Sequence, residues 1–510
     1  MKRVLIKSIG LCLIFIRLSS FGQVVEQSQN KHFWELIKAN KAVERWIPLA
    51  EGDSLRPIYH VTAASRLIGD PNGPIYFAGE YHVFFQHFPF WGDSTNFRPV
   101  WGHAVSPDMV HWRHLPIALA PTPGSYDDAA IASGCCVIDK GVPTIIYTGV
   151  GPQSQCLAIS DDNLRTWRKD LANPVIPSPP ALDSLGDGFR DPFAWREGDK
   201  WRLLVGSAFR GKGGTVLLYQ SNDLHKWEFI GPLCVGMGKR CIQWECPNFF
   251  PLKRRHILMV SPLFSDVPGL RGMVEYTVGN YHDNKFEYDH WQPVDLGGPT
   301  SYYAPNSFED TQGRRILWGF IMTDRSSKAG WCNSLSLPRV VTLATDGSLN
   351  FNPIPELTAL RYDERSHNNL KIEPNRELIM EKEFGMHYEV KIEVDLDKAS
   401  QFELRIGRSN DGDRFIPLKY NVKTSRLVFG DKEADFRLNP NEKTLSIRLF
   451  VDGSVGEAYI NGRVCFSNNL SLSLNSSGIS VMAEGGKARI KKFSLWKMNS
   501  IWPNKEIQTH

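Results

Sequence analysis

The chain has 510 residues, of which 42% are hydrophobic and 22% charged, a composition typical of a soluble globular protein with room for two or more domains. Its formal net charge is only +4, and no block of lysines and arginines stands out. Binding of nucleic acid through its phosphates is therefore not expected.

Residues 1–22 have the pattern of a secretory signal peptide. A basic segment precedes an apolar run at 8–16, and Ser20 and Gly22 place small residues at positions −3 and −1 of a cleavage site. Arg17 ends the apolar run before it is long enough to cross a bilayer, and no later stretch approaches the ~18 apolar residues required. We expect a secreted or periplasmic protein without a membrane span in its mature form. An uncleaved interfacial anchor is the alternative.

Eight of the nine cysteines follow this segment. They show neither C-x-x-C spacing nor a neighbouring histidine cluster, so no metal site is expected at them. Most of them are expected to be buried as small hydrophobic residues, and a bridge between Cys234 and Cys241 stays open as an alternative.

Five short segments begin alike and recur at nearly constant spacing. They start at Asp70, Ser133, Asp191, Glu245 and Ala304, so successive starts are 63, 58, 54 and 59 positions apart. A second repeated segment, which contains Ser, an acid and Trp, runs in step with the first and ends at Trp112, Trp167 and Trp227. A near-constant period of this size is typical of repeat architectures, in which each unit is one supersecondary block.

Each period contains about four apolar or β-branched runs separated by turn residues, which predicts four short strands per unit. After about residue 45, no long stretch has the period of an amphipathic helix. Five such units fill residues 56–345. The sequence therefore predicts an all-β protein whose first domain is a five-bladed β-propeller.

A second domain is predicted after the propeller. Pro353, Pro355 and the polar stretch 361–376 read as a connector. Beyond them, runs with alternating polar and apolar residues are joined by turns such as Asp452-Gly453. This pattern predicts a β-sandwich over residues 377–498.

Closing five blades into a ring would place the starts of the repeated segments at the mouth of the central channel, where Asp70, Asp191 and Glu245 would meet. Cleavage of a glycosidic bond needs one carboxyl group to protonate the leaving oxygen and a second as nucleophile or activator of water. The 15 tryptophans also suit a sugar site, because apolar sugar faces stack on indole rings. The alternatives are ordinary surface turns, and a propeller whose carboxylates bind sugar hydroxyls without catalysis.

The surroundings of two of these acids predict different protonation states. Glu245 follows Trp244 and precedes Cys246, an apolar setting that favours its protonated form. Asp70 is expected to be held ionised by backbone N–H groups and the amide of Asn72.

At these residues the chain resembles glycoside hydrolase family 32, the invertase and fructanase family. The motifs that carry the resemblance occur in order: Asp70-Pro-Asn-Gly, Trp101-Gly-His-Ala-Val-Ser, Arg190-Asp-Pro, Trp244-Glu-Cys-Pro, Phe308-Glu-Asp, Leu335-Ser-Leu-Pro-Arg, Phe450-Val-Asp-Gly-Ser-Val and Met482-Ala-Glu-Gly-Gly. The resemblance implies a five-bladed propeller followed by a β-sandwich, and cleavage of β-fructofuranosyl bonds with retention and without a cofactor.

The resemblance also implies a role for each acid. Asp70 would be the nucleophile and Glu245 the acid/base, while Asp191 would hold fructose hydroxyls and favour the oxocarbenium-like transition state. Predicted substrate contacts are Asn72, Gln86, Trp91, Trp101, Ser133, Arg190 and Phe320. For Gln86 and Ser133, ordinary polar residues at strand ends are the alternative.

The chain departs from the family pattern around the nucleophile. Leu67, Ile68 and Gly69 stand where the family usually has Trp, an apolar residue and Asn. Other departures are Phe88, Ala132, Cys135 and Phe320. With Ala132, the pocket is predicted to be wider near the leaving group, and Trp91 is expected to compensate. These changes bear on the substrate more than on the reaction.

The sequence as a whole predicts a secreted retaining hydrolase that releases fructose from sucrose or from inulin- or levan-type fructans. A fructosyltransferase with the same acids is the first alternative. The others are an inverting five-bladed hydrolase of arabinan or xylan, and a fructan-binding protein without catalytic activity.

Overall fold

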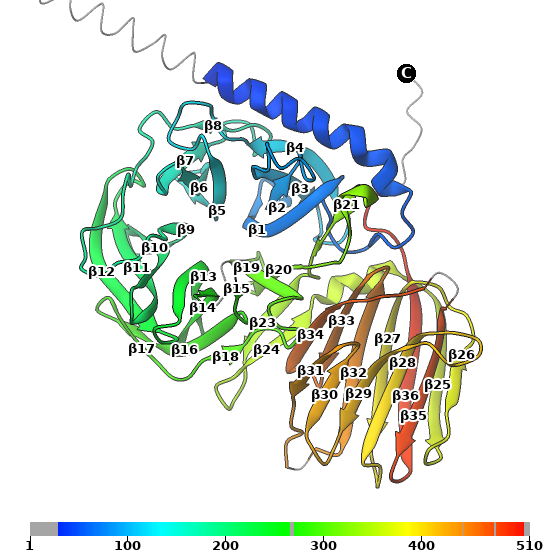
Figure 1. Ribbon diagram of the computed structural model, residues 1–510. Coiled ribbons are helices and arrows are strands. Elements are labelled where there is room, and N and C mark those ends of the chain that lie inside the picture. The colour runs from blue at the N-terminus through cyan, green and yellow to red at the C-terminus, as the bar shows by residue number, and fades with distance from the viewer. Residues whose placement is uncertain (1–28, 266–269, 441, 474–475, 504–510) are drawn as a thin grey trace, which may run out of the picture.

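The computed structural model describes residues 29–265, 270–440, 442–473 and 476–503. Figure 1 shows a ring of five sheets beside a two-layered sandwich, with a long helix running along the outside of the ring. The prediction of a five-bladed propeller followed by a β-sandwich is confirmed. The predicted signal peptide lies outside the described residues. Within them, no helix combines the length and apolar character needed to cross a bilayer.

Each blade is an antiparallel sheet whose first strand lies nearest the axis (Figure 1). Blade I contains β1 (Arg66–Phe77), β2 (Glu80–Phe88), β3 (Val100–Ser106) and β4 (Arg113–Leu119), and blade II contains β5 (Ala130–Asp139), β6 (Val142–Val150), β7 (Ser154–Ile159) and β8 (Arg168–Lys169). Blade III contains β9 (Arg190–Glu197), β10 (Lys200–Phe209), β11 (Gly213–Ser221) and β12 (Trp227–Gly236). Blade IV contains β13 (Cys241–Leu252), β14 (Arg255–Phe264), β16 (Glu275–His282) and β17 (Lys285–Tyr288), with β15 (Leu270–Arg271) and β18 (Gln292–Pro293) attached. Blade V contains β19 (Tyr302–Glu309), β20 (Arg315–Ile321), β23 (Arg339–Leu343) and β24 (Leu349–Pro353), with β22 (Ser334–Leu335) attached.

The ring is closed by a short strand, β21 (Trp331–Cys332), which leaves blade V after the 3-10 turn η1 (Ser327–Ala329) and pairs in parallel with the start of β1. The side-chain amide of Asn333 also donates to the backbone oxygen of Ile68 over 3.0 Å. First strands of successive blades contact one another all the way around the axis. The last blade therefore fixes the backbone immediately before Asp70.

All five innermost strands carry a β-bulge at the same level. In each case two residues of the innermost strand have no partner in the register. They lie between the paired residues Ile68 and Pro71, Ile131 and Gly134, Arg190 and Phe193, Glu245 and Asn248, and Tyr303 and Asn306. A bulged residue is left out of the ladder, so proline, which lacks an N–H, is tolerated there. The repeated pairs of a residue followed by proline are thus the sequence signal of the bulges.

The bulges show which residues of the five blades are equivalent, and in blade IV the equivalent residue differs from the predicted one. In blade I the Asn72 amide donates to the backbone oxygen of Asp70, and in blade IV the Asn248 amide donates in the same way to Cys246, both over 3.1 Å. Cys246, and not Glu245, is therefore the equivalent of Asp70. Glu245 lies one position earlier, because the motif of blade IV carries its acid before the bulge.

The sandwich consists of two six-stranded sheets with a common apolar core. One sheet has the order β25 (Arg361–Ile372), β36 (Ala488–Met498), β27 (His387–Asp395), β32 (Thr444–Asp452), β33 (Val455–Ile460) and β34 (Val464–Asn469). The other has the order β26 (Leu378–Glu381), β35 (Gly478–Glu484), β28 (Gln401–Arg408), β29 (Ile416–Asn421), β30 (Arg426–Phe429) and β31 (Lys432–Asp435). The 3-10 turn η2 (Pro355–Leu360) joins blade V to this domain.

Two predicted boundaries differ from the structure. The propeller ends with β24 at Pro353 rather than at 345, and most of the predicted connector 361–376 is the edge strand β25. Most residues of β25 are exposed, so its sequence lacks the alternation that indicates a half-buried strand. The helix at 29–51, which was not predicted, packs Ala39 and Val43 against blade I.

A buried cluster of charges joins the propeller to the sandwich. His60, just before blade I, contacts Asp452 over 2.8 Å and Glu457 over 3.0 Å. Arg339 of blade V forms ion pairs with Glu457 over 2.6 Å and with Asp295 over 2.9 Å. All five side chains are almost completely buried. Because an unpaired charge would be left inside, removing one partner is expected to be costly.

Replacement of Asp452 by asparagine is expected to lower the free energy of unfolding by about 3–5 kcal/mol. Differential scanning calorimetry, with the exposed Asp431→Asn as matched control, measures the difference. Equal thermal midpoints for the two variants would show that the charge cluster contributes nothing to stability.

The same cluster predicts how stability varies with pH. Although burial opposes the charged form, the two carboxylates raise the pKa of His60 to about 9, so its contribution is lost as the pH rises from about 6.5 to 9. Burial also opposes ionisation of Glu457, but Arg339 and His60 lower its pKa to about 2, so its contribution is lost as the pH falls from about 4.5 to 2. We therefore expect the highest midpoint between pH 4.5 and 6.5.

Candidate active site

The structure brings the three predicted acids together at the axis. Ser133 Oγ of blade II donates to Asp70 Oδ2 over 2.6 Å. Cys246 Sγ of blade IV lies 3.6 Å from Asp70 Oδ2 and 3.8 Å from Asp191 Oδ2, and its backbone N–H donates to the same oxygen of Asp191 over 3.1 Å. Residues at equivalent bulges of four blades therefore form one chain of contacts, from Ser133 through Asp70 and Cys246 to Asp191.

A second row of contacts holds Glu245. Its Oε1 accepts from Arg190 Nη2 over 2.6 Å and from Nε over 3.0 Å, and its Oε2 accepts from the Tyr303 hydroxyl over 2.8 Å. These three residues each precede the bulge of their own blade, so they lie at the same level of the channel. The Arg190 guanidinium also lies 4.0 Å from Asp191 and thus links the two rows.

The surroundings raise the proton affinity of both aspartates. Burial and the charge of Glu245 raise the pKa of Asp70 to about 6, although the hydrogen bond from Ser133 opposes this. Burial raises the pKa of Asp191 to about 7, and the charges of Glu245 and Asp70 add to the effect against the attraction of Arg190. Both aspartates therefore hold their protons more tightly than carboxyl groups in water do.

Two predictions about the environments of the acids are wrong. Glu245 is bound by a guanidinium and a phenol instead of lying in apolar surroundings, because neighbouring residues of a strand point to opposite faces and Trp244 is buried on the other side. The Asn72 amide donates to the backbone of Asp70 and not to its carboxylate. Ser133 supplies the direct hydrogen bond instead.

These contacts predict a pH profile. If the ionised form of Asp70 is the reactive one, kcat/KM falls below about pH 6, where this carboxylate becomes protonated. The substitution Ser133→Ala removes a hydrogen bond that favours the charged form, so the acidic limb is expected to move to higher pH. Ser106→Ala, which removes a hydroxyl that bonds Asp108 in the outer part of blade I, is the matched control. An unchanged acidic limb in Ser133→Ala would contradict the assignment of that limb to protonation of Asp70.

The predicted substrate contacts divide into two groups. Gln86 Nε2 donates to Ser133 Oγ over 3.1 Å, so both lie in the hydrogen-bond chain that reaches Asp70. Asn72 and Trp101 are fully buried, and the Trp101 indole donates to the backbone oxygen of Ala132. The Trp101 ring packs in the core between blades I and II and, within the described chain, makes no contact with the three acids, and its contact with substrate stays a prediction.

The departures from the family pattern place aromatic rings close to Asp70. A side chain at Gly69 would have its Cβ 3.6 Å from the ring of Phe88 and 3.4 Å from Gln86 Cβ. Phe88 in turn stacks on Phe97, with ring centroids 4.7 Å apart. Phe88 therefore lines the space opened by glycine. Trp91 is the residue expected to compensate for Ala132. The Arg66 guanidinium lies 5.6 Å from the centroid of the Trp91 ring.

Three residues of the site were not predicted: Cys246, Tyr303 and Arg271. The Arg271 guanidinium lies 5.0 Å from the ring centroid of Tyr303 and 5.8 Å from that of Phe320, which is almost completely buried. The repeat could have indicated Tyr303, which holds the place of Glu245 in blade V. No repeat or motif in the sequence marks Arg271.

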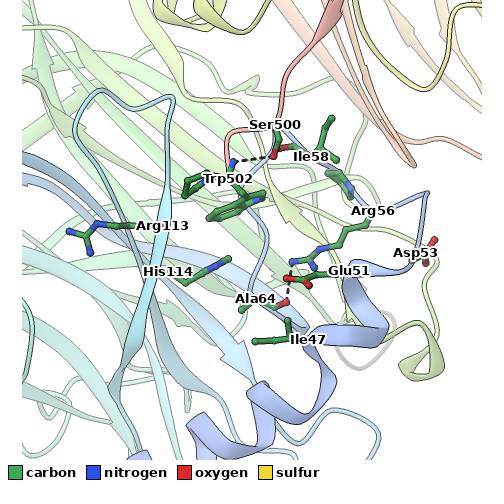
Figure 2. Close-up of a pocket in the computed structure, with 12 residues that line it drawn as sticks. Ile47, Glu51, Asp53, Arg56, Ile58, Ala64, Arg113, His114, Ser500 and Trp502 are labelled. Atoms are coloured by element: carbon green, nitrogen blue, oxygen red, sulfur yellow. Dashed lines mark hydrogen bonds between the residues drawn. The ribbon is translucent and has the colours of Figure 1, made fainter. Parts of the chain in front are cut away.

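Two cavities bear on the argument, and none of the three acids lines either of them. One of about 310 Å³ lies between blades III and IV, and its lining includes Arg190, Lys239, Gln243 and Leu263. Another, of about 660 Å³, lies between the helix at 29–51, blade I and the C-terminal segment (Figure 2). There His114 stacks on Trp502 with ring centroids 4.1 Å apart. This second cavity shares no lining residue with the first, so it is separate from Arg190 and the groups at the axis.

The cysteines and the acids of the described chain form neither disulfides nor a metal-ligand cluster. All eight cysteines of the described chain are free thiols, so Cys234 and Cys241 are not bridged. Among the residues described, no three His, Cys, Asp or Glu side chains are grouped as metal ligands, so the acids at the axis are not arranged in that way.

Comparisons with known proteins point to one family. Residues 60–353 match the model of the glycosyl hydrolases family 32 N-terminal domain, and residues 356–497 match that of the family 32 C terminal. A sucrose-6-phosphate hydrolase of Zymomonas mobilis is 30% identical, over 92% of this chain and 97% of its own length. A levanase of Bacillus subtilis is 28% identical, over 88% and 71%. Among solved structures, a GH32 beta-fructofuranosidase of Bombyx mori is 26% identical with a TM-score of 0.76, over 92% and 99%.

Proposed function

Since the chain belongs to glycosyl hydrolase family 32, we propose that it hydrolyses β-fructofuranosides by a retaining double displacement carried out by Asp70 and Glu245. The observation that carries this proposal is the connected set of contacts at the axis. Cys246 touches Asp70 and Asp191, while Arg190 touches Asp191 and Glu245. Glycosidic cleavage requires two carboxyl groups close to one bond, and these contacts link Asp70 to Glu245 through Cys246, Asp191 and Arg190.

In the first step, Asp70 attacks the anomeric carbon of fructose while Glu245 protonates the departing oxygen. The bond between fructose and the leaving sugar breaks, and a fructosyl ester forms on Asp70. In the second step, Glu245 takes a proton from water, which attacks the same carbon and releases fructose and the Asp70 carboxylate.

The other groups at the axis have supporting roles. Asp191 accepts hydrogen bonds from fructose hydroxyls and places negative charge beside the oxocarbenium-like transition state. Arg190 and Tyr303 hold the Glu245 carboxyl in position through their hydrogen bonds. The chain Gln86 to Ser133 to Asp70 orients the nucleophile.

Sucrose and fructans are the proposed substrates. The relatives are named sucrose-6-phosphate hydrolase and levanase, and the Bombyx mori structure is that of a beta-fructofuranosidase. Lys239, in the cavity next to Arg190, makes sucrose 6-phosphate a second candidate, because its ammonium suits an anionic substituent on the leaving sugar, whereas Arg210 there is paired with Asp187.

We also propose that the protein is exported. The basic segment, apolar run and small residues within residues 1–22 support a cleaved signal peptide. Expression of the full chain in a bacterial host, followed by N-terminal sequencing, tests this. A mature chain that begins at Gln23 in the periplasm or medium is expected, whereas retention of Met1 would contradict export.

The function is tested on a panel of sucrose, sucrose 6-phosphate, 1-kestose, inulin and levan, with release of fructose as the readout. Retention is tested by adding methanol, which competes with water in the second step. Methyl β-fructofuranoside is expected, whereas the α-anomer would indicate inversion and exclude a covalent role for Asp70. Lengthened oligosaccharides at high sucrose would favour the transferase alternative. Binding without turnover on any substrate would show a fructan-binding protein.

A further inference from the structure

Arg271 is a cation at the mouth of the site that no motif marks. It lies on β15, the two-residue strand that pairs with the end of β14. Its guanidinium rests over the rings of Tyr303 and Phe320, and its Nη1 lies 3.5 Å from Met322 Sδ. Among the described residues, Arg271 forms no ion pair with a carboxylate, and the residue is exposed. Most of its N–H donors are therefore available to a ligand.

The position of Arg271 relative to the acids indicates which part of a substrate it would meet. Tyr303, under the guanidinium, donates to Glu245, the carboxyl proposed to protonate the departing oxygen. The leaving sugar must lie against Glu245 for this proton transfer. Leu263, which pairs with Arg271, also lines the cavity of about 310 Å³ that adjoins Arg190. The leaving sugar thus has space on the side of the site where Arg271 lies.

Aromatic faces hold the guanidinium in place without using its hydrogen-bond donors. Two ring contacts fix a planar cation, which lowers the entropy lost when it binds a ligand. A guanidinium presents several N–H groups in a fixed fork, so it can bind two neighbouring hydroxyls of one sugar ring.

We propose that Arg271 binds hydroxyl groups of the leaving sugar and so determines the preference for sugar over non-sugar leaving groups. This inference rests on the proposed function, since it takes Glu245 as the acid of the first step. Arg271 acts on the part of the substrate that departs. Burial raises the pKa of Asp70 to about 6 and the charge of Arg271 opposes this rise, so the two substrates are compared well above pH 6, where Asp70 is ionised. Phe320 and Tyr303 serve as its support.

The test compares sucrose with methyl β-fructofuranoside, which has the same fructosyl half but no hydroxyl on its leaving group. In Arg271→Met, kcat/KM for sucrose is expected to fall by roughly tenfold to hundredfold, the effect of losing hydrogen bonds to a charged donor. For methyl β-fructofuranoside, the expected change is less than about threefold. Arg271→Lys, which keeps the charge but loses the fork, is expected to recover only part of the loss.

The matched control is Arg254→Met, at the exposed turn between β13 and β14, the opposite end of the same strand pair. Equal losses for both substrates, with the acidic limb of the pH profile shifted upward, would show that Arg271 acts on Asp70 instead and overturn the proposal. An unchanged ratio of the two substrates in Arg271→Met would overturn it as well. Wild-type enzyme inactive on both compounds would instead count against the proposed function.

Discussion

Asp70→Asn is expected to lower kcat on sucrose by roughly 10⁴- to 10⁶-fold, because an amide oxygen cannot form the fructosyl ester. The side chain keeps its size, and its amide oxygen can still accept the hydrogen bond from Ser133. The fold and the affinity for substrate should therefore persist. Activity is measured by fructose release, and binding by calorimetry with sucrose.

Asp108→Asn serves as the control for this substitution, because Asp108 accepts backbone N–H groups in an outer turn of blade I. A second variant, Asp70→Ala, opens space for azide, which should restore turnover and give a fructosyl azide of inverted configuration. Retention of more than a tenth of the wild-type kcat in Asp70→Asn would remove Asp70 from the nucleophile role.

Glu245→Gln is expected to lower kcat on sucrose by roughly 10²- to 10⁴-fold, the usual contribution of a positioned general acid. The loss should depend on the leaving group. An aryl β-fructofuranoside releases a phenolate that needs little protonation, so formation of the fructosyl ester should be much less affected. The ester should then accumulate, because the second step needs Glu245 as a base.

A burst of phenolate followed by slow turnover in stopped-flow measurements would reveal this accumulation. Glu287→Gln, at an exposed position of β17 in the same blade, is the control. Equal losses on sucrose and the aryl substrate would show that Glu245 does not act as the proton donor. The Arg190 and Tyr303 contacts would then have a structural purpose only.

The ring could be predicted from the sequence because its repeated feature is local. Proline next to a bulge recurs in four blades, at Pro71, Pro192, Pro247 and Pro305, and each marks the same point of an innermost strand. The phase of blade IV was misjudged because the acid, and not the bulge, was aligned. Edge strand β25 was missed because an exposed strand has no alternation to read.

The site was only partly predictable, since several contacts depend on residues that meet across blades. Arg190 binding Glu245 follows from the ring geometry and not from either motif alone. Trp101 belongs to a motif but is buried, and motif membership does not distinguish a core residue from one that faces the channel. Arg271 lies on a strand of two residues and owes its position to the rings beneath it.

The closure of the ring by β21 bears on how the protein is made. The ribosome produces Asp70 early, but the strand that pairs with the start of β1 and the amide that holds Ile68 are translated only with residues 331–333. A nascent chain, or a degradation fragment that stops before this point, lacks the partners that fix the backbone just before Asp70. A chain truncated before residue 331 is therefore expected to lack hydrolytic activity even where its first four blades have formed.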